Sequence, residues 1–338
     1  MKYRRLGRSG LFVSELCLGT MTFGRETDKE TAIRMIHQFL DAGGNFIDTA
    51  DVYAEGRSEE IVGQAIKGRR SEVIVATKVR MKVGPHPNDA GYARKRIMDG
   101  VEQSLRRLGT DYIDLYQLHV WDHLTPIEET LRTLDDLVSS GKVRYIGCSN
   151  FLAWQLMKAL AYSDFNNYVR FISIQPQYSL VNREMDREVL SLCLEEEVGV
   201  IPWAPLAGGF LTGKYPRSKE KPNFGRFNNS STGEYMWERK ATDRNFKILD
   251  KVKSIADELG KTPAQVALNW LLCKEGITSP IFGARTPEQL EENLGSTGWR
   301  LSAEHFKALD EVSKLPSEYP NRFIDKFRRD VIYDNLEV

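Results

Sequence analysis

Short apolar runs alternate with longer amphipathic segments along the whole chain. The runs are rich in Val and Ile and are apolar at nearly every position, a pattern typical of parallel strands that are buried on both faces. This pattern predicts eight strands, at residues 13–20, 45–50, 73–78, 113–119, 143–150, 171–178, 198–206 and 277–283.

The segments between these runs repeat apolar residues at i, i+3 and i+4, the period of an amphipathic helix, and they end near Gly with basic or polar residues close by. Examples are residues 28–44, 93–109, 125–142 and 182–199. Strand and helix alternate without a break in composition over all 338 residues. We therefore expect one α/β domain, residues 1–338, folded as a single (β/α)8 TIM barrel, with an open doubly wound sheet as the alternative.

Three segments fall outside this repeat. Residues 2–13, with Gly7 and Gly10 at turn-like positions, are expected to form an N-terminal β-hairpin that closes the floor of the barrel. Residues 207–240, rich in Gly, Pro, Asn, Ser and charge, are the longest loop candidate and follow the seventh strand onto the face where barrel enzymes carry their active sites. The tail after Leu315 mixes aromatic and charged residues and indicates no role.

Composition narrows the possible partners. Lys plus Arg and Asp plus Glu both number 47, so the formal net charge is zero, which argues against nucleic acid or an anionic membrane as a partner. No uncharged apolar stretch reaches the ~20 residues of a membrane span, and the N-terminus lacks a signal-type apolar segment, so we expect a cytoplasmic protein. The four cysteines are far apart and lack CxxC spacing, as expected for buried free thiols in a reducing compartment; they are Cys17, Cys148, Cys193 and Cys273.

Four polar residues close, or closely follow, predicted strands. Asp48 and Tyr53 belong to the second strand and the turn after it, Lys78 ends the third, and His119 ends the fourth. Because the carboxyl ends of parallel barrel strands share one rim, we expect these side chains to face one another. The positive charge of Lys78 is expected to lower the pKa of Tyr53, while Asp48 keeps Lys78 charged and oriented.

Each of these residues, taken alone, has a structural explanation. A strand-end Asp often caps a turn, a Tyr often packs half-buried, and a His often makes a structural hydrogen bond. Their joint placement carries the functional interpretation: an acid, a phenol, an ammonium and an imidazole are the groups needed to move a proton to a carbonyl oxygen.

Three other motifs in the chain are incomplete. His119 and His123 have H-x3-H spacing but no further ligands at suitable spacing, so no metal site is predicted. The segment GCSNF resembles a nucleophile elbow but lacks its closing Gly. Residues 208–214 match G-x-x-x-x-G-K, yet Tyr215 and Pro216 follow where a P-loop needs Ser or Thr and a helix.

Eight segments, taken together and in order, resemble the aldo-keto reductase family. They are LGTMTFG, NFIDTADVYAEGRSEEIVG, VIVATK, DYIDLYQLH, GKVRYIGCSN, IQPQYSLVNRE, APLAGGFLTGKY and TPEQLEENL, and they cover most of the chain. The resemblance implies a barrel oxidoreductase that binds NADP(H) without a Rossmann domain and reduces a small-molecule aldehyde or ketone. It also implies a catalytic tetrad of Asp48, Tyr53, Lys78 and His119, in which Tyr53 is the general acid.

The same resemblance implies the cofactor-binding residues. At the nicotinamide end it points to hydrogen-bonding groups and to a Trp that stacks on the ring. At the other end it points to a loop around the pyrophosphate and to groups at the adenosine. The full set is Gly19, Thr20, Met21, Asp48, Ser149, Asn150, Gln175, Trp203, Ala204, Pro205, Leu206, Ala207, Gly208, Lys214, Arg226, Gly283, Arg285, Gln289, Glu292 and Asn293.

Two of these positions bear on cofactor choice and on the type of protein. Arg285 is a natural partner for a 2′-phosphate, which favours NADP over NAD. Trp203 stands where many members of the family have Tyr, and the potassium-channel β subunits, a regulatory branch, also have Trp there. That branch carries Asn at the position of His119, which favours an enzyme here.

Two alternatives stay open from sequence: a regulatory NADP-binding subunit with little turnover, and an unrelated barrel enzyme that abstracts protons. For the substrate pocket the loops offer Trp121, His123, Phe224 and Trp237 as candidate contacts. The physiological substrate and the oligomeric state are not indicated.

Overall fold

The computed structural model describes residues 1–228 and 233–329. Eight parallel strands form one sheet in the order β10-β3-β4-β5-β6-β7-β8-β9, and a separate antiparallel pair, β1 and β2, precedes them. The strands are β1 Tyr3–Arg5, β2 Phe12–Ser14, β3 Cys17–Gly19, β4 Phe46–Asp48, β5 Ile74–Val79, β6 Ile113–Leu118, β7 Val143–Ser149, β8 Phe171–Gln175, β9 Gly199–Val200 and β10 Ile281–Gly283.

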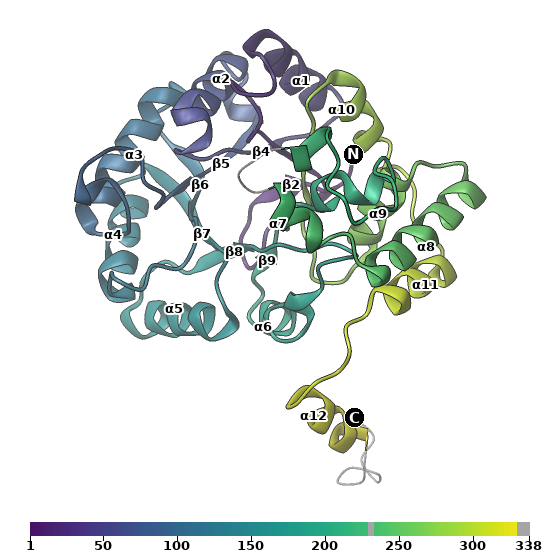
Figure 1. Cartoon of the computed structure of the whole chain (residues 1–338). Coiled ribbons are helices and arrows are strands. Elements are labelled where there is room, and N and C mark those ends of the chain that lie inside the picture. The colour runs from purple at the N-terminus through teal and green to yellow at the C-terminus, as the bar shows by residue number, and fades with distance from the viewer. Residues whose placement is uncertain (229–232, 330–338) are drawn as a thin grey trace.

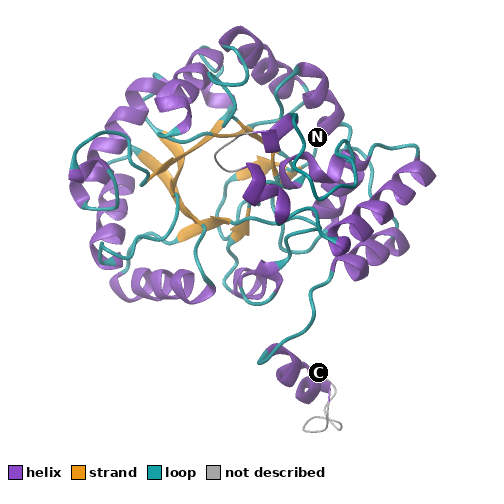
Figure 2. Cartoon of the chain, viewed as in Figure 1, coloured by secondary structure: helices purple, strands orange, loops and turns teal. Residues whose placement is uncertain are grey.

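The two edges of the sheet meet and close a barrel. The Ile281 amide donates to the Pro202 carbonyl at 2.8 Å, and parallel bridges join Val200 to Ile277 and Trp203 to Ile281. Figure 2 shows the ring of strands with helices around its outside. The predicted (β/α)8 barrel is therefore confirmed.

Helices cover the outer face of the barrel, as Figure 1 shows. They are α1 Lys29–Asp41, α2 Arg57–Ala65, α3 Arg94–Leu108, α4 Ile127–Ser139, α5 Ala153–Asn166, α6 Val189–Glu195, α8 Asp243–Leu259, α9 Pro263–Cys273, α10 Pro287–Leu294 and α11 Ala303–Ser313. Two further helices do not belong to this cover: α7 Gly233–Glu238, in the segment after β9, and α12 Asn321–Arg329, in the tail. Local sequence sets several of their ends. Asp28 caps α1 by accepting from the Thr31 amide at 2.9 Å, Thr262 and Gln265 form a capping box on α9, and α3 ends at Gly109 in a left-handed conformation.

The N-terminal hairpin closes the floor of the barrel, as predicted. Leu6 and Val13 from the hairpin are fully buried in one cluster with Phe46, Ala76 and Leu115 from the barrel strands. The approach is so close that a Cβ on Gly7 would lie 2.1 Å from the Ile172 carbonyl oxygen, and Gly7 has φ +55°. Only glycine fits this position.

Some predicted boundaries are wrong. The expected strand at 13–20 is divided: its first residues pair in the hairpin, and β3 begins at Cys17. The seventh and eighth strands are much shorter than predicted, because β9 holds only two residues and the chain beyond it makes isolated bridges.

The predicted long loop at 207–240 is not featureless. It contains 3-10 turns at Ala207–Thr212 and Gly225–Asn228 and the short helix α7, while the part at 229–232 lies outside the described residues. The buried aromatic rings of Phe210, Tyr215, Phe227 and Trp237 pack on one another, with centroids 5.0–6.1 Å apart, and hold the segment together.

The C-terminal tail forms α12, which lies apart from the ring of helices in Figure 1. Its first residue is tied to the body by a hydrogen bond from the Asn321 side chain to the Arg187 carbonyl at 2.8 Å. Among the described helices, none is long and apolar enough to cross a bilayer.

Candidate active site

The four strand-end residues converge at the carboxyl ends of β4, β5 and β6. Lys78 is at the centre, with 0% of its side chain exposed. Its ammonium lies 2.6 Å from Asp48 Oδ2, 2.8 Å from the Thr49 carbonyl oxygen and 3.2 Å from the Tyr53 hydroxyl. The prediction that these distant residues share one rim is thus confirmed in geometry, with Lys78 joining the acid to the phenol.

Two glutamines that the sequence interpretation did not assign to the tetrad support Asp48. Gln117 and Gln175 donate side-chain amides to Asp48 Oδ1 at 3.1 and 2.7 Å. Gln175 had been assigned to the cofactor, and Gln117 had been missed. A signal existed for Gln117, because it precedes His119 by two residues on one strand and so faces the same side of the sheet.

Burial sets the protonation state of the tetrad. Burial raises the pKa of Tyr53 above its usual value of 10, Lys78 opposes this shift, and Asp48 adds to it. The expectation that Lys78 would lower the pKa of Tyr53 is therefore wrong in its net direction. Burial lowers the pKa of Lys78, but Asp48 and Tyr53 outweigh it and leave that pKa above 10.5. At neutral pH the phenol keeps its proton and the lysine keeps its charge.

His119 faces Tyr53 across the mouth, with ring centroids 6.1 Å apart and planes at 80°. Burial, Lys78 and Arg80 together lower the pKa of His119 to about 3. Its imidazole is therefore neutral at physiological pH. The Nδ1 atom is buried and has no hydrogen-bond partner among the described residues.

The turn that carries Tyr53 has a strained backbone and lies next to a buried ion pair. Ala54 and Glu55 have φ of +48° and +60°, values that L-residues rarely adopt. Just before Tyr53, the carboxylate of Asp51 pairs with the Arg96 guanidinium of α3, and both side chains are at most 3% exposed. The segment that carries Tyr53 is thus anchored to the helix layer, through two residues that no sequence pattern connects.

A second set of predicted residues forms a hydrogen-bonded patch at the ends of β7 and β8. Asn150 donates to the His119 carbonyl at 3.0 Å and to Ser149 Oγ at 2.9 Å, and it accepts from Trp203 Nε1 at 3.1 Å. Ser149 Oγ in turn donates to the Gln175 carbonyl at 2.7 Å. Asn150 has φ +55°, so the strand end turns sharply and presents the amide beside the tetrad.

The loop after β9 combines positive backbone angles with positive charge. Ala204, Ala207 and Gly208 have φ of +52°, +51° and +70°, with Pro205 and Leu206 between them. Burial, and then Arg285, lower the pKa of Lys214. The cations of Lys214 and Arg285, which come from loops distant in sequence, thus lie close enough to repel each other.

Arg226 extends this positive region toward the tetrad. Burial lowers the pKa of Arg226 although Glu26 raises it, and Arg25 and Arg285 add to the lowering. Its guanidinium lies 3.6 Å from the Met21 sulfur.

The remaining predicted cofactor residues lie around β3 and β10. Gly19 of β3 pairs with Asp48 on one side and with Gly283 on the other. Thr20 is fully buried and donates to the Asp48 carbonyl at 3.0 Å. At the start of α10, the Gln289 side chain accepts from the Arg285 amide at 2.9 Å, and Asn293 reaches the Gly283 carbonyl at 3.5 Å. Glu292 acts on Lys214 by its charge.

Four loop residues were suggested for the substrate pocket, and for one of them this prediction is wrong. Trp237 is fully buried in the aromatic cluster of the 207–240 segment and is a core residue. Phe224 packs on Tyr215, and His123 is exposed. Trp121 follows His119 by two residues and packs edge-on against Phe151 at 5.0 Å.

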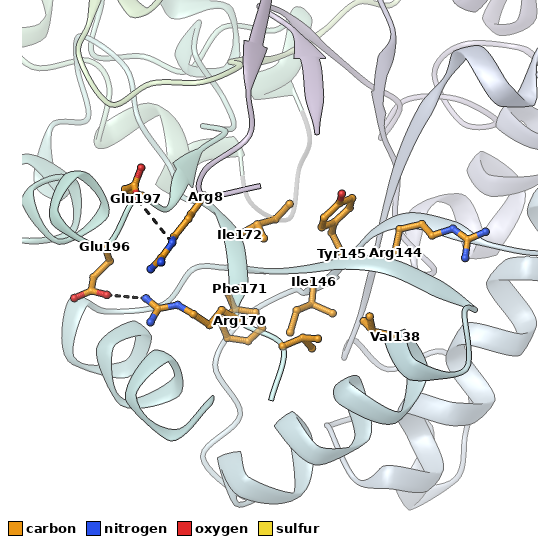
Figure 3. Close-up of a pocket in the computed structure, with 11 residues that line it drawn as sticks. Arg8, Val138, Arg144, Tyr145, Ile146, Arg170, Phe171, Ile172, Glu196 and Glu197 are labelled. Carbon is orange, nitrogen blue, oxygen red and sulfur yellow. Dashed lines mark hydrogen bonds and ion pairs between the residues drawn. The ribbon is translucent and has the colours of Figure 1, made fainter. Parts of the chain in front are cut away.

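A hollow of about 330 Å³ lies at the opposite end of the barrel, near the first residues of β8 (Figure 3). It contains none of the predicted site residues. Arg8 and Arg170 point toward Glu197 and Glu196, with N–O distances of 3.9 and 2.6 Å, so the charges of these two arginines are already balanced. No cluster of three or more His, Cys, Asp or Glu residues able to hold a metal occurs in the described part of the chain.

Comparison with known proteins identifies the family. Residues 15–314 match the model of the Aldo/keto reductase family. The chain belongs to this family. It is 38% identical to an uncharacterized oxidoreductase of Bacillus subtilis, YrpG, over 94% of this chain and 97% of the relative.

Other relatives have different printed functions. A probable voltage-gated potassium channel subunit beta of Arabidopsis thaliana is 39% identical, over 87% of this chain and 90% of the relative. A versiconal hemiacetal acetate reductase of Aspergillus parasiticus is 34% identical, over 92% of this chain and 96% of the relative. Family membership and the reductase relatives support an oxidoreductase that acts on carbonyl groups.

Proposed function

We propose that this aldo/keto reductase reduces aldehydes or ketones to alcohols with NADPH, and that Tyr53 is the general acid. The observation that carries the proposal is the buried chain Asp48–Lys78–Tyr53, with O–N distances of 2.6 and 3.2 Å, facing a neutral His119. A charged lysine beneath a protonated phenol is suited to give a proton to an oxygen that becomes negative.

The donor groups on the same face fit a phosphorylated dinucleotide. The charge of Arg285 lowers the pKa of both Lys214 and Arg226, after burial; Glu292 opposes the lowering at Lys214, and Glu26 and Tyr53 oppose it at Arg226. Such concentrated positive charge is favourable only when an anion neutralises it. The amide and hydroxyl groups of Ser149, Asn150 and Gln175 can hold a carboxamide, and Trp203 is placed to stack on a ring. NADPH, when bound there, supplies the hydride.

The side chains of the tetrad then divide the proton chemistry among them. The Tyr53 hydroxyl donates its proton to the carbonyl oxygen as that oxygen gains negative charge, and Lys78 stabilises the phenolate that remains. Asp48, with its two glutamine donors, keeps Lys78 charged and in place. Neutral His119 donates a hydrogen bond to the same oxygen and orients it.

Arg285 is predicted to select NADPH over NADH. Replacing it (Arg285→Ala) should weaken NADPH binding about 10- to 100-fold, because charge-assisted hydrogen bonds to a phosphate are lost, and should change NADH binding less than about threefold. Fluorescence titration of both cofactors measures the two dissociation constants. Arg34→Ala, which removes an exposed arginine of α1, is the matched control. Equal losses for both cofactors would show that Arg285 does not contact the 2′-phosphate.

The pH dependence of kcat/KM should differ from that of an enzyme whose catalytic histidine titrates near pH 6.5. With NADPH saturating, kcat/KM for an aldehyde should vary less than about threefold from pH 5.5 to 8.5, because the pKa of His119 is lowered to about 3 and burial raises the pKa of Tyr53 above its usual value. A change in kcat/KM centred near pH 6.5 that is absent in His119→Asn would contradict the conclusion that His119 is neutral over this range.

His119 should also make stability depend on pH. In the unfolded chain its pKa is about 6.5, so between pH 6.5 and about 3 the unfolded state binds a proton that the folded state does not. The contribution of His119 to the free energy of unfolding is therefore complete above pH 6.5 and is lost as the pH falls toward 3. Melting curves should show the wild type losing stability relative to His119→Asn as the pH drops from 7 to 4.

The similarity to a potassium channel β subunit favours one alternative, a regulatory protein that binds NADP(H) with little turnover. Saturating NADPH with a panel of aromatic and aliphatic aldehydes separates the two functions. Steady NADPH oxidation supports the reductase, whereas tight cofactor binding without oxidation supports the regulatory protein.

A further inference from the structure

Arg80 lies beside the tetrad and has no part in the mechanism above. It follows Lys78 by two residues, at the carboxyl end of β5, and its φ is +139°, in the region that favours glycine. Its carbonyl accepts from the Gly91 amide at 2.9 Å, which fixes this strained backbone. A non-glycine residue in such a conformation is a signal that its side chain has a use.

The guanidinium of Arg80 is poorly satisfied. Its Nε atom is buried and has no hydrogen-bond partner among the described residues. Among the described residues its one ion pair, to Asp122, is long at 4.0 Å between Nη2 and Oδ1, and the side chain is 25% exposed.

Asp122 is already occupied by other donors. It accepts from the amides of Tyr92 and Leu124, both at 3.1 Å, and from the Thr125 hydroxyl at 2.8 Å. Arg80 therefore keeps hydrogen-bonding capacity for a further acceptor.

Arg80 is also a neighbour of His119 across the two strands. The His119 amide donates to the carbonyl of Val79, the residue before Arg80, at 3.1 Å. The charge of Arg80 is one of the causes that keep His119 neutral, after burial and Lys78. Whereas Lys78 is compensated by Asp48 at 2.6 Å, Arg80 has no carboxylate in hydrogen-bond contact in the described chain. Arg80 thus carries positive charge near His119 that Asp122 balances only incompletely.

We propose that Arg80 forms an anion subsite next to the tetrad, and that the enzyme prefers aldehydes or ketones that also carry a carboxylate. The planar guanidinium matches a carboxylate in bidentate geometry, and partial burial strengthens that contact. This inference rests on the proposed carbonyl reduction and adds the class of substrate to it.

The test compares two aldehydes of nearly equal size, 4-formylbenzoate and 4-formylbenzamide, which differ in charge. The wild type should reduce the carboxylate with the higher kcat/KM. In Arg80→Met the value for 4-formylbenzoate should fall about 10- to 100-fold, mainly through KM, while that for 4-formylbenzamide should change less than about threefold. Arg80→Lys keeps the charge but loses the planar guanidinium. Its kcat/KM for 4-formylbenzoate should therefore lie between those of the wild type and Arg80→Met. Arg94→Met, which removes an arginine paired with Asp136 on the outer ring of helices, is the control.

Several outcomes would overturn the subsite. If Arg80→Met lost the same factor in kcat/KM for both aldehydes, Arg80 would only position His119 or its loop. If the wild type reduced both aldehydes equally well and Arg80→Met did not change either rate, no carboxylate would bind at Arg80. Calorimetric titration of both aldehydes into the NADP-saturated protein separates this proposal from the reductase function. A preference for the carboxylate that is lost in Arg80→Met, without turnover of either aldehyde, would keep the subsite and reject the reductase.

Discussion

Tyr53→Phe is expected to reduce carbonyl turnover by at least about 10² to 10⁴, the usual contribution of a general acid. The variant removes the only group that the mechanism uses to protonate the developing alkoxide. It should fold normally, because the hydrogen bond from Lys78 to the hydroxyl is long at 3.2 Å, and Lys78 keeps Asp48 and the Thr49 carbonyl as partners. NADPH oxidation with an aldehyde, measured beside the NADPH dissociation constant, tests this.

Two comparisons make the Tyr53 experiment specific. Tyr3→Phe removes a phenolic hydroxyl at the hairpin, where it donates to the Gly43 carbonyl, and should leave kcat within about twofold of wild type because it is remote from the reacting atoms. In Tyr53→Phe the dissociation constant of NADPH should stay within about threefold, so that the loss is in kcat. Retention of more than a tenth of the activity would remove Tyr53 from the role of acid.

The sequence predicts the barrel and the convergence of the tetrad for the same physical reason. Parallel strands place their carboxyl ends on one rim, so Asp48, Lys78 and His119 meet although up to 71 residues separate them in the printed sequence. Strand length was predicted less well, because apolar runs continue beyond the last ladder hydrogen bond. Between the seventh and eighth strands, isolated bridges from Val200 to Ile277 and from Trp203 to Ile281 replace a regular ladder.

Other features of the site depend on three-dimensional packing that no local pattern encodes. The Asp51–Arg96 pair joins a turn to a helix 45 residues away, and nothing in either segment indicates the other. The direction of the Tyr53 pKa shift follows from how completely the ring is buried, and charge pairing alone predicted the opposite sign. The strained backbone of Arg80 is likewise visible only in the fold.

Lys78→Met should remove both activity and much of the stability. Activity should fall about 10² to 10⁴, because the phenolate of Tyr53 loses its counter-charge. The free energy of unfolding should fall by about 3–5 kcal/mol, the typical cost of removing one partner from a buried pair. Asp48, whose side chain is 3% exposed, would keep only the amide donors of Gln117 and Gln175. Urea denaturation at pH 7 gives the stability, and NADPH oxidation gives the activity.

A second substitution separates these two effects. In Asp48→Asn/Lys78→Met no charge remains at the pair, so most of the lost stability should return, while activity should stay at the level of Lys78→Met. The stability losses are then strongly non-additive, as expected for two charges that compensate each other 2.6 Å apart in the core. If the double variant were instead as unstable as the sum of the single variants, Lys78 and Asp48 would act independently. The link from the carboxylate through the ammonium to the phenol, on which the proposed proton transfer depends, would then be broken at its first step.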